Sequence, residues 1–318
     1  MNLQRAHLTF ITAVLITGAT FTACSQDANK TRPGIIWTLD WSPDDKYIAF
    51  GGDDSLLWIY NAGNMQMYKT IPMKNMVRKV AWSPDSKSLL VSTKDGAQIM
   101  DLETSKHVYL PGTGSARGMA WNRDGSMVAT ATNQIMVWTT SGELVRTLRK
   151  EHNNSLLSLD WDHNKDLIIS SGDEIRVFDL ASGKQLKMFR HREESTGVLT
   201  VKWHPSGEFF ASGDYGHDNV ESIVRFWKPD GTLTKTLHGS KSEYRNVAWS
   251  KDGKFLATAS DALRIWTKDG DLVAASPQQT DNLWGIDWDS KGERIATTSA
   301  DGKMVIWNKK GEVIKKIK

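Results

Sequence analysis

The strongest constraint on this chain of 318 residues is a short motif that recurs seven times. Each copy has a tryptophan, a polar turn and an apolar run that ends in small residues, as in TLDWSPDDKYIAF and NVAWSKDGKFLAT. The tryptophans are spaced by 41, 39, 40, 42, 46 and 39 residues and are Trp41, Trp82, Trp121, Trp161, Trp203, Trp249 and Trp288. A unit of this length cannot bury an apolar face alone, so the copies must stack on one another.

Each unit divides into four short runs that read as antiparallel strands joined by turns, and helical periodicity is not sustained anywhere. A period of about 40–45 residues is that of a four-stranded propeller blade. We therefore predict an all-β, seven-bladed propeller over residues 35–318. The last repeat supplies its own fourth strand, EVIKKIK, so we expect blade 7 to be built from that repeat alone and the ring to close by packing of blade 1 on blade 7.

The repeats resemble the WD40 family. The third strand ends in an aromatic residue in six units and in Met100 in the second, but only Met100-Asp101 and Phe178-Asp179 keep the acidic second residue of the family's dipeptide. The family's Gly-His pair is mostly missing, although His152, His191 and His238 lie near its expected place. The resemblance implies a His–Asp–Ser–Trp network that braces each blade, and these departures predict that it is incomplete here.

Twelve of the fourteen tryptophans have a packing explanation. Seven lie in the first strands, where blades converge. Five more lie in third strands, and these are Trp58, Trp138, Trp227, Trp266 and Trp307. We expect all twelve in the core, where truncation of a buried aromatic residue to alanine typically costs about 3–5 kcal/mol. Trp37 and Trp284 remain unexplained.

The first residues are typical of a secretory signal, with Arg5, a short apolar run and small residues before Cys24. The pattern FTA-C resembles the lipobox of bacterial lipoproteins, which implies a cleaved signal over 1–23 and a lipidated Cys24. Residues 24–34 would then be the lipidated cysteine and a polar tether. The alternative is an ordinary cleaved signal with an incidental cysteine.

That resemblance implies an exported protein anchored to a membrane of the bacterial cell envelope. Ser25 after the cysteine favours the outer membrane if the organism is Gram-negative. Cys24 is the only cysteine, so the chain cannot form an internal disulfide.

Charge argues against nucleic acid as a partner. The formal net charge is +3, and no run of five or more basic residues occurs. The Lys-rich C-terminal end reads as an edge strand with a solvated face.

We find no catalytic motif, no phosphate-binding loop and no cofactor signature. Asp40, Asp160 and Asp287 each precede a first-strand tryptophan, and paired carboxylates can serve acid–base chemistry. The simpler interpretation is that they accept hydrogen bonds from backbone donors or line a wet channel. We predict no catalytic residue and no cofactor.

Blade 5 carries one insertion, GDYGHDNVES, between its second and third strands. Asp214, His217, Asp218 and Glu221 have the residue types that ligate metals. Their close spacing and single histidine favour a polar loop, so we predict no metal site.

The binding face is predicted from a position that resembles a known partner-binding position of WD40 proteins, four residues before the first-strand tryptophan. It holds Trp37, Arg78, Arg117, Leu157, Leu199, Arg245 and Trp284. Trp37 and Trp284 should lie side by side, and Tyr215 and His217 of the insertion should overhang the same rim. Aromatic and arginine residues are enriched at interface hot spots.

We therefore expect a non-enzymatic scaffold that binds an unknown protein or peptide carrying an acidic group beside an apolar one. The partner-binding residues would be Trp37, Arg78, Arg117, Arg245, Trp284, Tyr215 and His217. Two alternatives stay open, namely an envelope hydrolase of the propeller type and a receptor for a cation or a sugar.

Overall fold

The computed structural model describes residues 34–149, 155–193, 197–216, 220–279 and 281–317. The predicted signal, Cys24, residues 25–33 of the tether and His217 lie outside the described residues. Within the described residues, no helix has the length and apolar character needed to cross a bilayer.

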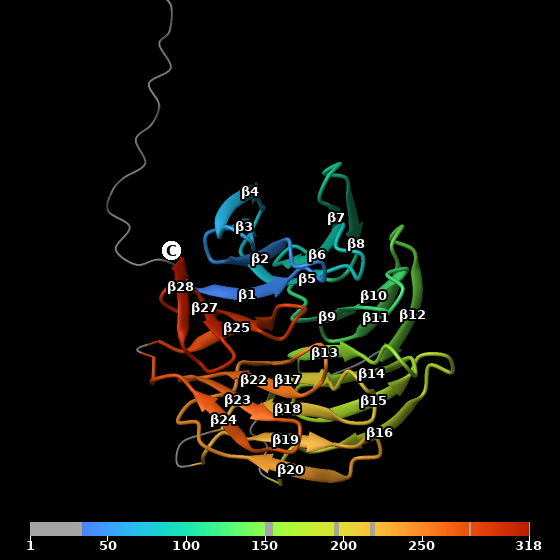
Figure 1. The fold of residues 1–318 in the computed structure, drawn as a ribbon. Coiled ribbons are helices and arrows are strands. Elements are labelled where there is room, and N and C mark those ends of the chain that lie inside the picture. Colours follow the sequence, from blue (N-terminus) through green and yellow to red (C-terminus); the bar gives the residue numbers. More distant parts are fainter. Residues whose placement is uncertain (1–33, 150–154, 194–196, 217–219, 280, 318) are drawn as a thin grey trace, which may run out of the picture. The chain divides into compact units, whose positions relative to one another are not determined.

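The chain forms seven four-stranded antiparallel sheets, each a meander in sequence order, which confirms the predicted seven-bladed propeller (Figure 1). Blades 1 to 4 comprise β1 (Ile36–Trp41), β2 (Tyr47–Gly52), β3 (Leu56–Asn61) and β4 (Gln66–Pro72); β5 (Val77–Trp82), β6 (Ser88–Thr93), β7 (Ala97–Asp101) and β8 (His107–Leu110); β9 (Gly118–Trp121), β10 (Met127–Ala131), β11 (Ile135–Thr139) and β12 (Leu144–Arg149); and β13 (Ser158–Trp161), β14 (Leu167–Ser171), β15 (Ile175–Asp179) and β16 (Gln185–Phe189). Blades 5 to 7 comprise β17 (Val198–Trp203), β18 (Phe210–Asp214), β19 (Val224–Trp227) and β20 (Leu233–Leu237); β21 (Asn246–Trp249), β22 (Phe255–Ala259), β23 (Leu263–Thr267) and β24 (Leu272–Ala275); and β25 (Leu283–Trp288), β26 (Arg294–Ser299), β27 (Met304–Asn308) and β28 (Val313–Ile317).

The polar turn between the first two strands has the same backbone form in every blade. One turn residue adopts positive φ, between 53° and 74°, in all seven blades, and these residues are Asp45, Ser86, Gly125, Asp166, Gly207, Gly253 and Gly292. This left-handed region is open to glycine and is visited by short polar residues. The recurring Asp or Gly of the motif is thus explained by turn geometry.

The hydrophobic core is divided among the junctions between blades. Seven clusters of buried side chains each draw on two adjacent blades. The seven repeat tryptophans, each the last residue of its first strand, are all buried. Four of them donate an indole hydrogen bond to a backbone carbonyl of the preceding blade, and these are Trp82, Trp121, Trp249 and Trp288. Each such tryptophan therefore fills a junction and also ties it by a hydrogen bond.

Eleven of the twelve tryptophans predicted for the core are buried, and Trp58 is the exception. Trp58 is only partly buried, and its indole nitrogen donates to Asp54 Oδ2 over 2.8 Å. It occupies the middle of β3 rather than the position where third-strand aromatic residues pack, which in this blade belongs to Tyr60. The prediction of a fully buried Trp58 was therefore wrong.

The ring closes as predicted, with blade 7 built entirely from the last repeat. Blade 7, in red, lies beside blade 1, in blue (Figure 1), and one apolar cluster joins Leu39 and Trp41 to Ile306 and Ile317. Ser290 adds hydrogen bonds from its backbone N–H and its hydroxyl to the Asp45 carboxylate, at 2.7 and 2.6 Å. The outer strand β28 is exposed along Val313–Lys316, as expected of a solvated edge strand.

Candidate functional site

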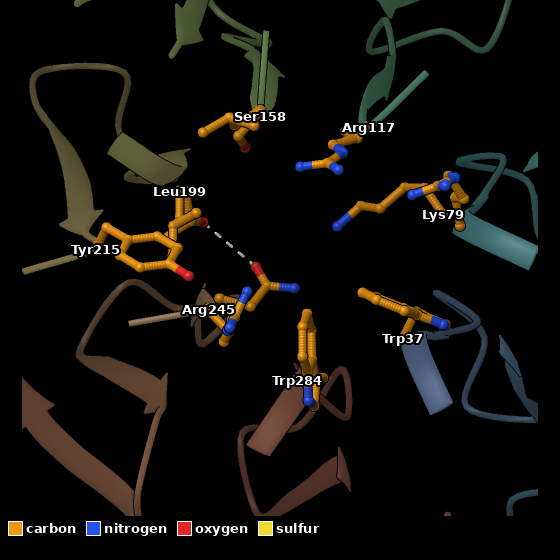
Figure 2. Close-up of a pocket in the computed structure, with 12 residues that line it drawn as sticks. Trp37, Lys79, Arg117, Ser158, Leu199, Tyr215, Arg245 and Trp284 are labelled. Atoms are coloured by element: carbon orange, nitrogen blue, oxygen red, sulfur yellow. Dashed lines mark hydrogen bonds between the residues drawn. The ribbon is translucent and has the colours of Figure 1, made fainter. Parts of the chain in front are cut away.

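The seven residues that lie four positions before the first-strand tryptophans, here called the rim residues, line one cavity of about 440 Å³ (Figure 2). Each belongs to the first strand of its blade or directly precedes that strand. Because the blades are arranged around a ring, equivalent positions converge. The predicted convergence of the rim residues is confirmed, and their role in binding stays a prediction.

Trp37 and Trp284 meet edge to face, with ring centroids 4.5 Å apart and an interplanar angle of 67°. They come from β1 and β25, the first strands of blades 1 and 7. Gly285 permits this approach, because a Cβ there would lie 2.7 Å from the backbone nitrogen of Leu39. The Trp37 indole donates to Asp53 Oδ1 over 2.5 Å, which holds that ring in place. The predicted pairing of the two tryptophans is thus observed.

Arg245 lies against two aromatic rings, those of Trp284 and Tyr215. Its guanidinium carbon is 3.9 Å from the ring centroid of Trp284 and 5.6 Å from that of Tyr215. Tyr215 belongs to the blade 5 insertion, is 49% exposed, and is held by a hydrogen bond from its backbone N–H to Gly197 O. Arg245 also forms an ion pair with Glu243. The insertion therefore reaches the rim as predicted.

The other three cations of the cavity have no such counter-charge. Arg78, Lys79 and Arg117 form no ion pair or side-chain hydrogen bond with a described residue, and Arg78 Nε is buried without a partner. Although Arg117 reaches solvent, the surrounding protein and then the charges of Arg78 and Arg245 lower its pKa. Among the described lining residues, none is a carboxylate. The cavity is therefore electropositive.

A second tier of lining residues was not predicted from the sequence. Lys79, Ser158, Thr200 and Asn246 each follow a rim residue directly and line the same cavity. Thr200 Oγ1 donates to Asn246 Oδ1 over 3.4 Å. These residues could have been predicted from the sequence, because the position three residues before each repeat tryptophan recurs with the same period as the rim position.

The aspartates that precede the first-strand tryptophans tie neighbouring blades together. Asp40 accepts from the backbone N–H of Trp82 over 2.6 Å, Asp160 from that of Trp203 over 2.7 Å, and Asp287 from that of Trp41 over 2.9 Å. This confirms the simpler interpretation, in which they satisfy backbone donors.

Burial strongly shifts the protonation of these charged groups. Burial and then the neighbouring Asp287 raise the pKa of Asp40 well above its usual value, and burial also raises the pKa of Asp287. Burial alone would lower the pKa of Lys202, but Asp160, at 2.8 Å, raises it. Lys79 lines the cavity, and burial followed by the charge of Lys202 lowers its pKa. Burial therefore disfavours the charged forms of Asp40, Asp287 and Lys79.

Comparison with known proteins agrees with this architecture. Residues 39–124 match the family of the anaphase-promoting complex subunit 4 WD40 domain, residues 151–286 that of eukaryotic translation initiation factor eIF2A, and residues 270–308 the WD domain, G-beta repeat. The chain is a WD40-repeat β-propeller.

Individual proteins resemble parts of this WD40 propeller. The F-box-like/WD repeat-containing protein TBL1X of Mus musculus is 27% identical over 134 residues, which cover 37% of this chain and 24% of that protein. A chromatin assembly factor 1 subunit of Gallus gallus is 29% identical over 133 residues, covering 35% and 23%. The intraflagellar transport protein 80 homolog of Rattus norvegicus is 28% identical over 103 residues, covering 32% and 13%. The chain thus spans at most about a quarter of the length of these relatives.

Blade 5 of the WD40 propeller has part of the bracing network. In blade 5, His191 Nδ1 and Ser212 Oγ are 2.9 Å apart, Trp227 Nε1 donates to Ser212 Oγ over 2.8 Å, and His191 Nε2 lies 3.6 Å from Asp214 Oδ2. Blades 3, 6 and 7 keep only an indole-to-threonine bond, and these pairs are Trp138–Thr130, Trp266–Thr258 and Trp307–Thr297. His191 reaches its place in blade 5 without the usual glycine before it, but its distance to Asp214 exceeds that of a hydrogen bond. Among the described residues, the network is therefore incomplete, as predicted.

The acidic residues of the blade 5 insertion are engaged within the protein. Asp214 pairs with Arg192 and accepts from the backbone N–H of Ile223, and Glu221 accepts from Gly239 N and binds His238. Asp218, like His217, lies outside the described residues. Among the described residues, no group of three or more His, Cys, Asp or Glu side chains is arranged to hold a metal ion.

Proposed function

We propose that this WD40 propeller is a binding scaffold rather than an enzyme, and that it holds a protein or peptide partner in the rim cavity. The partner would present an acidic group beside an apolar or aromatic one. A single observation carries this proposal: four cations and two paired tryptophans line one cavity that no described carboxylate lines. Arginine supplies directional contacts to carboxylates, and the tryptophans supply stacking area.

The burial pattern of the rim supports the same function. Trp37 and Trp284 are only partly buried, unlike the seven tryptophans that end the first strands, so the core accounts for only part of their surface. Tyr215 is 49% exposed at the edge of the cavity. Large half-exposed aromatic residues beside arginine are the composition of interface hot spots.

The relatives support a scaffold in a general way. The anaphase-promoting complex protein and the chromatin assembly factor 1 protein are both named as subunits of assemblies. By analogy, this chain would act through contacts with another protein.

A cationic ligand is disfavoured at this cavity. An ammonium group stacked on Trp284 would compete with Arg245, which already lies over that ring at 3.9 Å. Arg78, Lys79 and Arg117 would add repulsion. No observation on the described residues favours the hydrolase or sugar-receptor alternatives.

Matched peptides test the proposal. Capped peptides that carry Asp beside Trp should bind the purified propeller more tightly than the same peptides with Asn in place of Asp. The double variant Trp37→Ala with Trp284→Ala, shown by circular dichroism to remain folded, should lose this binding. Leu157→Ala, on the far side of the same rim, is the control and should matter less. Equal binding of the Asp and Asn peptides, or undiminished binding by the folded double variant, would contradict the proposal.

We also propose that the protein works at a membrane of the bacterial cell envelope. The support is the lipobox-like sequence before Cys24 and the polar residues 25–34 that follow it. A tether of this kind would leave the propeller free to bind a partner near the membrane surface.

A further inference from the structure

Arg245 differs from the other rim arginines because its charge is already neutralised inside the protein. Glu243 forms an ion pair with it, and the two side chains are only 16% and 20% exposed. Ser242 Oγ donates to Glu243 Oε2 over 2.7 Å, and Asn282 Nδ2 donates to Oε1 over 3.4 Å. The carboxylate is therefore held at Arg245 from several sides.

We propose that Glu243 is a built-in counter-ion that determines where the ligand's anionic group binds. By occupying Arg245, it directs that group to Arg78, Lys79 and Arg117, and it leaves Arg245 as a flat stacking surface between Trp284 and Tyr215. This inference rests on the proposed function, because it assigns subsites within the same cavity.

Electrostatics give the reason for this division. An anion that approached Arg245 would meet the Glu243 carboxylate beside it, and like charges at short range repel strongly where water is partly excluded. Arg78 and Arg117 form no ion pair with a described carboxylate, so an anion there meets no such repulsion, whereas Arg245 is paired with Glu243. Arg78 and Lys79 belong to blade 2, which follows blade 1 with Trp37, and Arg117 belongs to blade 3. Figure 2 shows Lys79 between Arg117 and Trp37, so one ligand can place its anionic group there and its ring on the tryptophans.

Two dyes with the same ring system provide the test. Anilinonaphthalene sulfonate carries an anionic group, and N-phenylnaphthylamine does not, and both report binding by fluorescence. The wild type should bind the sulfonate more tightly. Arg78→Met or Arg117→Met should weaken sulfonate binding by about tenfold or more, as expected for the loss of a hydrogen bond to a charged group. Lys254→Met, at an exposed ion pair away from the cavity, should have no effect.

A double-mutant cycle isolates the effect of the Glu243 charge on ligand binding. Glu243→Gln should tighten sulfonate binding by about three- to tenfold, the effect of one screened charge interaction near a surface, and should leave the neutral dye unchanged. Arg245→Met should weaken sulfonate binding, because Glu243 then faces the cavity unpaired. The variant with both substitutions should return close to wild-type affinity. Glu243→Ser tests the same point if the Gln variant proves unfolded by circular dichroism.

The outcomes separate the two proposals. If the wild type shows no preference for the sulfonate over the neutral dye, the proposed function is wrong for this cavity. If the preference depends on Arg78 and Arg117 but Glu243→Gln and Glu243→Ser leave it unchanged, the cavity function stands and the counter-ion role of Glu243 is refuted.

Discussion

The backbone N–H of Trp41 donates to Asp287 Oδ2 over 2.9 Å and so joins two residues that are 246 positions apart in the sequence. The bond crosses the junction between blade 7 and blade 1, where no strand of one blade completes the sheet of the other. The ring is therefore held closed by side-chain contacts, namely the apolar cluster around Trp41 and the hydrogen bonds of Asp287 and Ser290.

Asp287→Ala should destabilise the protein by about 1–3 kcal/mol, because the backbone N–H of Trp41 would lose its acceptor at a part-buried site. Asp287→Asn keeps a carbonyl oxygen as acceptor and should cost less. Urea unfolding of both variants measures the difference. Equal stability of the Ala variant and the wild type would show that this bond does not contribute to closure.

Removal of residues 312–318 should destabilise the ring more than a terminal deletion normally does. It deletes β28 and with it Ile317, which packs in the cluster shared with blade 1. The loss should exceed the roughly 2–5 kcal/mol expected for Ile317→Ala alone. Thermal unfolding of the two variants and of Lys315→Ala, an exposed control, tests this. An unchanged unfolding temperature after the deletion would mean that the segment is not part of the closing blade.

His191 should make the stability of blade 5 depend on pH. Burial, followed by the charges of Arg225 and Arg192, lowers the pKa of His191 to about 3. An unfolded histidine has a pKa of about 6.5. Above that pH the imidazole is neutral in both states, and the stability it contributes is fully present. As the pH falls from about 6.5 to about 3, the unfolded chain takes up a proton that the folded blade does not, so stability falls by about 1.4 kcal/mol per pH unit.

The comparison that isolates this effect is wild type against His191→Asn. The variant should be less stable at neutral pH, because the contact between His191 and Ser212 is altered, but its stability should fall less steeply between pH of about 6.5 and about 4. Free energies of unfolding measured at several pH values would give parallel curves if His191 were not responsible.

Cys24→Ser should abolish acylation and release the protein from membranes. The reason is chemical, because the proposed lipid would be attached through the sulfur of Cys24, which serine lacks. Intact-mass measurement of the mature wild type should find a chain that begins at a lipid-modified Cys24. A mature chain that retains an unmodified Cys24, or that begins after it, would contradict the anchor.

The repeat alone was enough to predict the number of blades and the place of each first strand. The resemblance to WD40 proteins indicated the rim position, and the repeat then gave one rim residue in each blade. These features follow from periodicity, since equivalent positions of a closed ring must face the same axis. Trp37 and Trp284 could be paired for this reason, although they lie near opposite ends of the propeller sequence. The position after each rim residue could have been used in the same way, and would have identified Lys79 and Asn246.

The tertiary structure decided which of the rim side chains already have a partner inside the protein. Arg78 and Arg245 occupy equivalent positions, yet only Arg245 is neutralised, because the segment before β21 brings Glu243 against it. Likewise Asp53 holds the Trp37 indole, and His191 contacts Ser212 in blade 5. Side-chain partners depend on the paths of loops that differ from blade to blade, and loop paths carry no periodic signal. The sequence therefore determined where the cavity lies, and the tertiary structure determined which of its charges are free to meet a ligand.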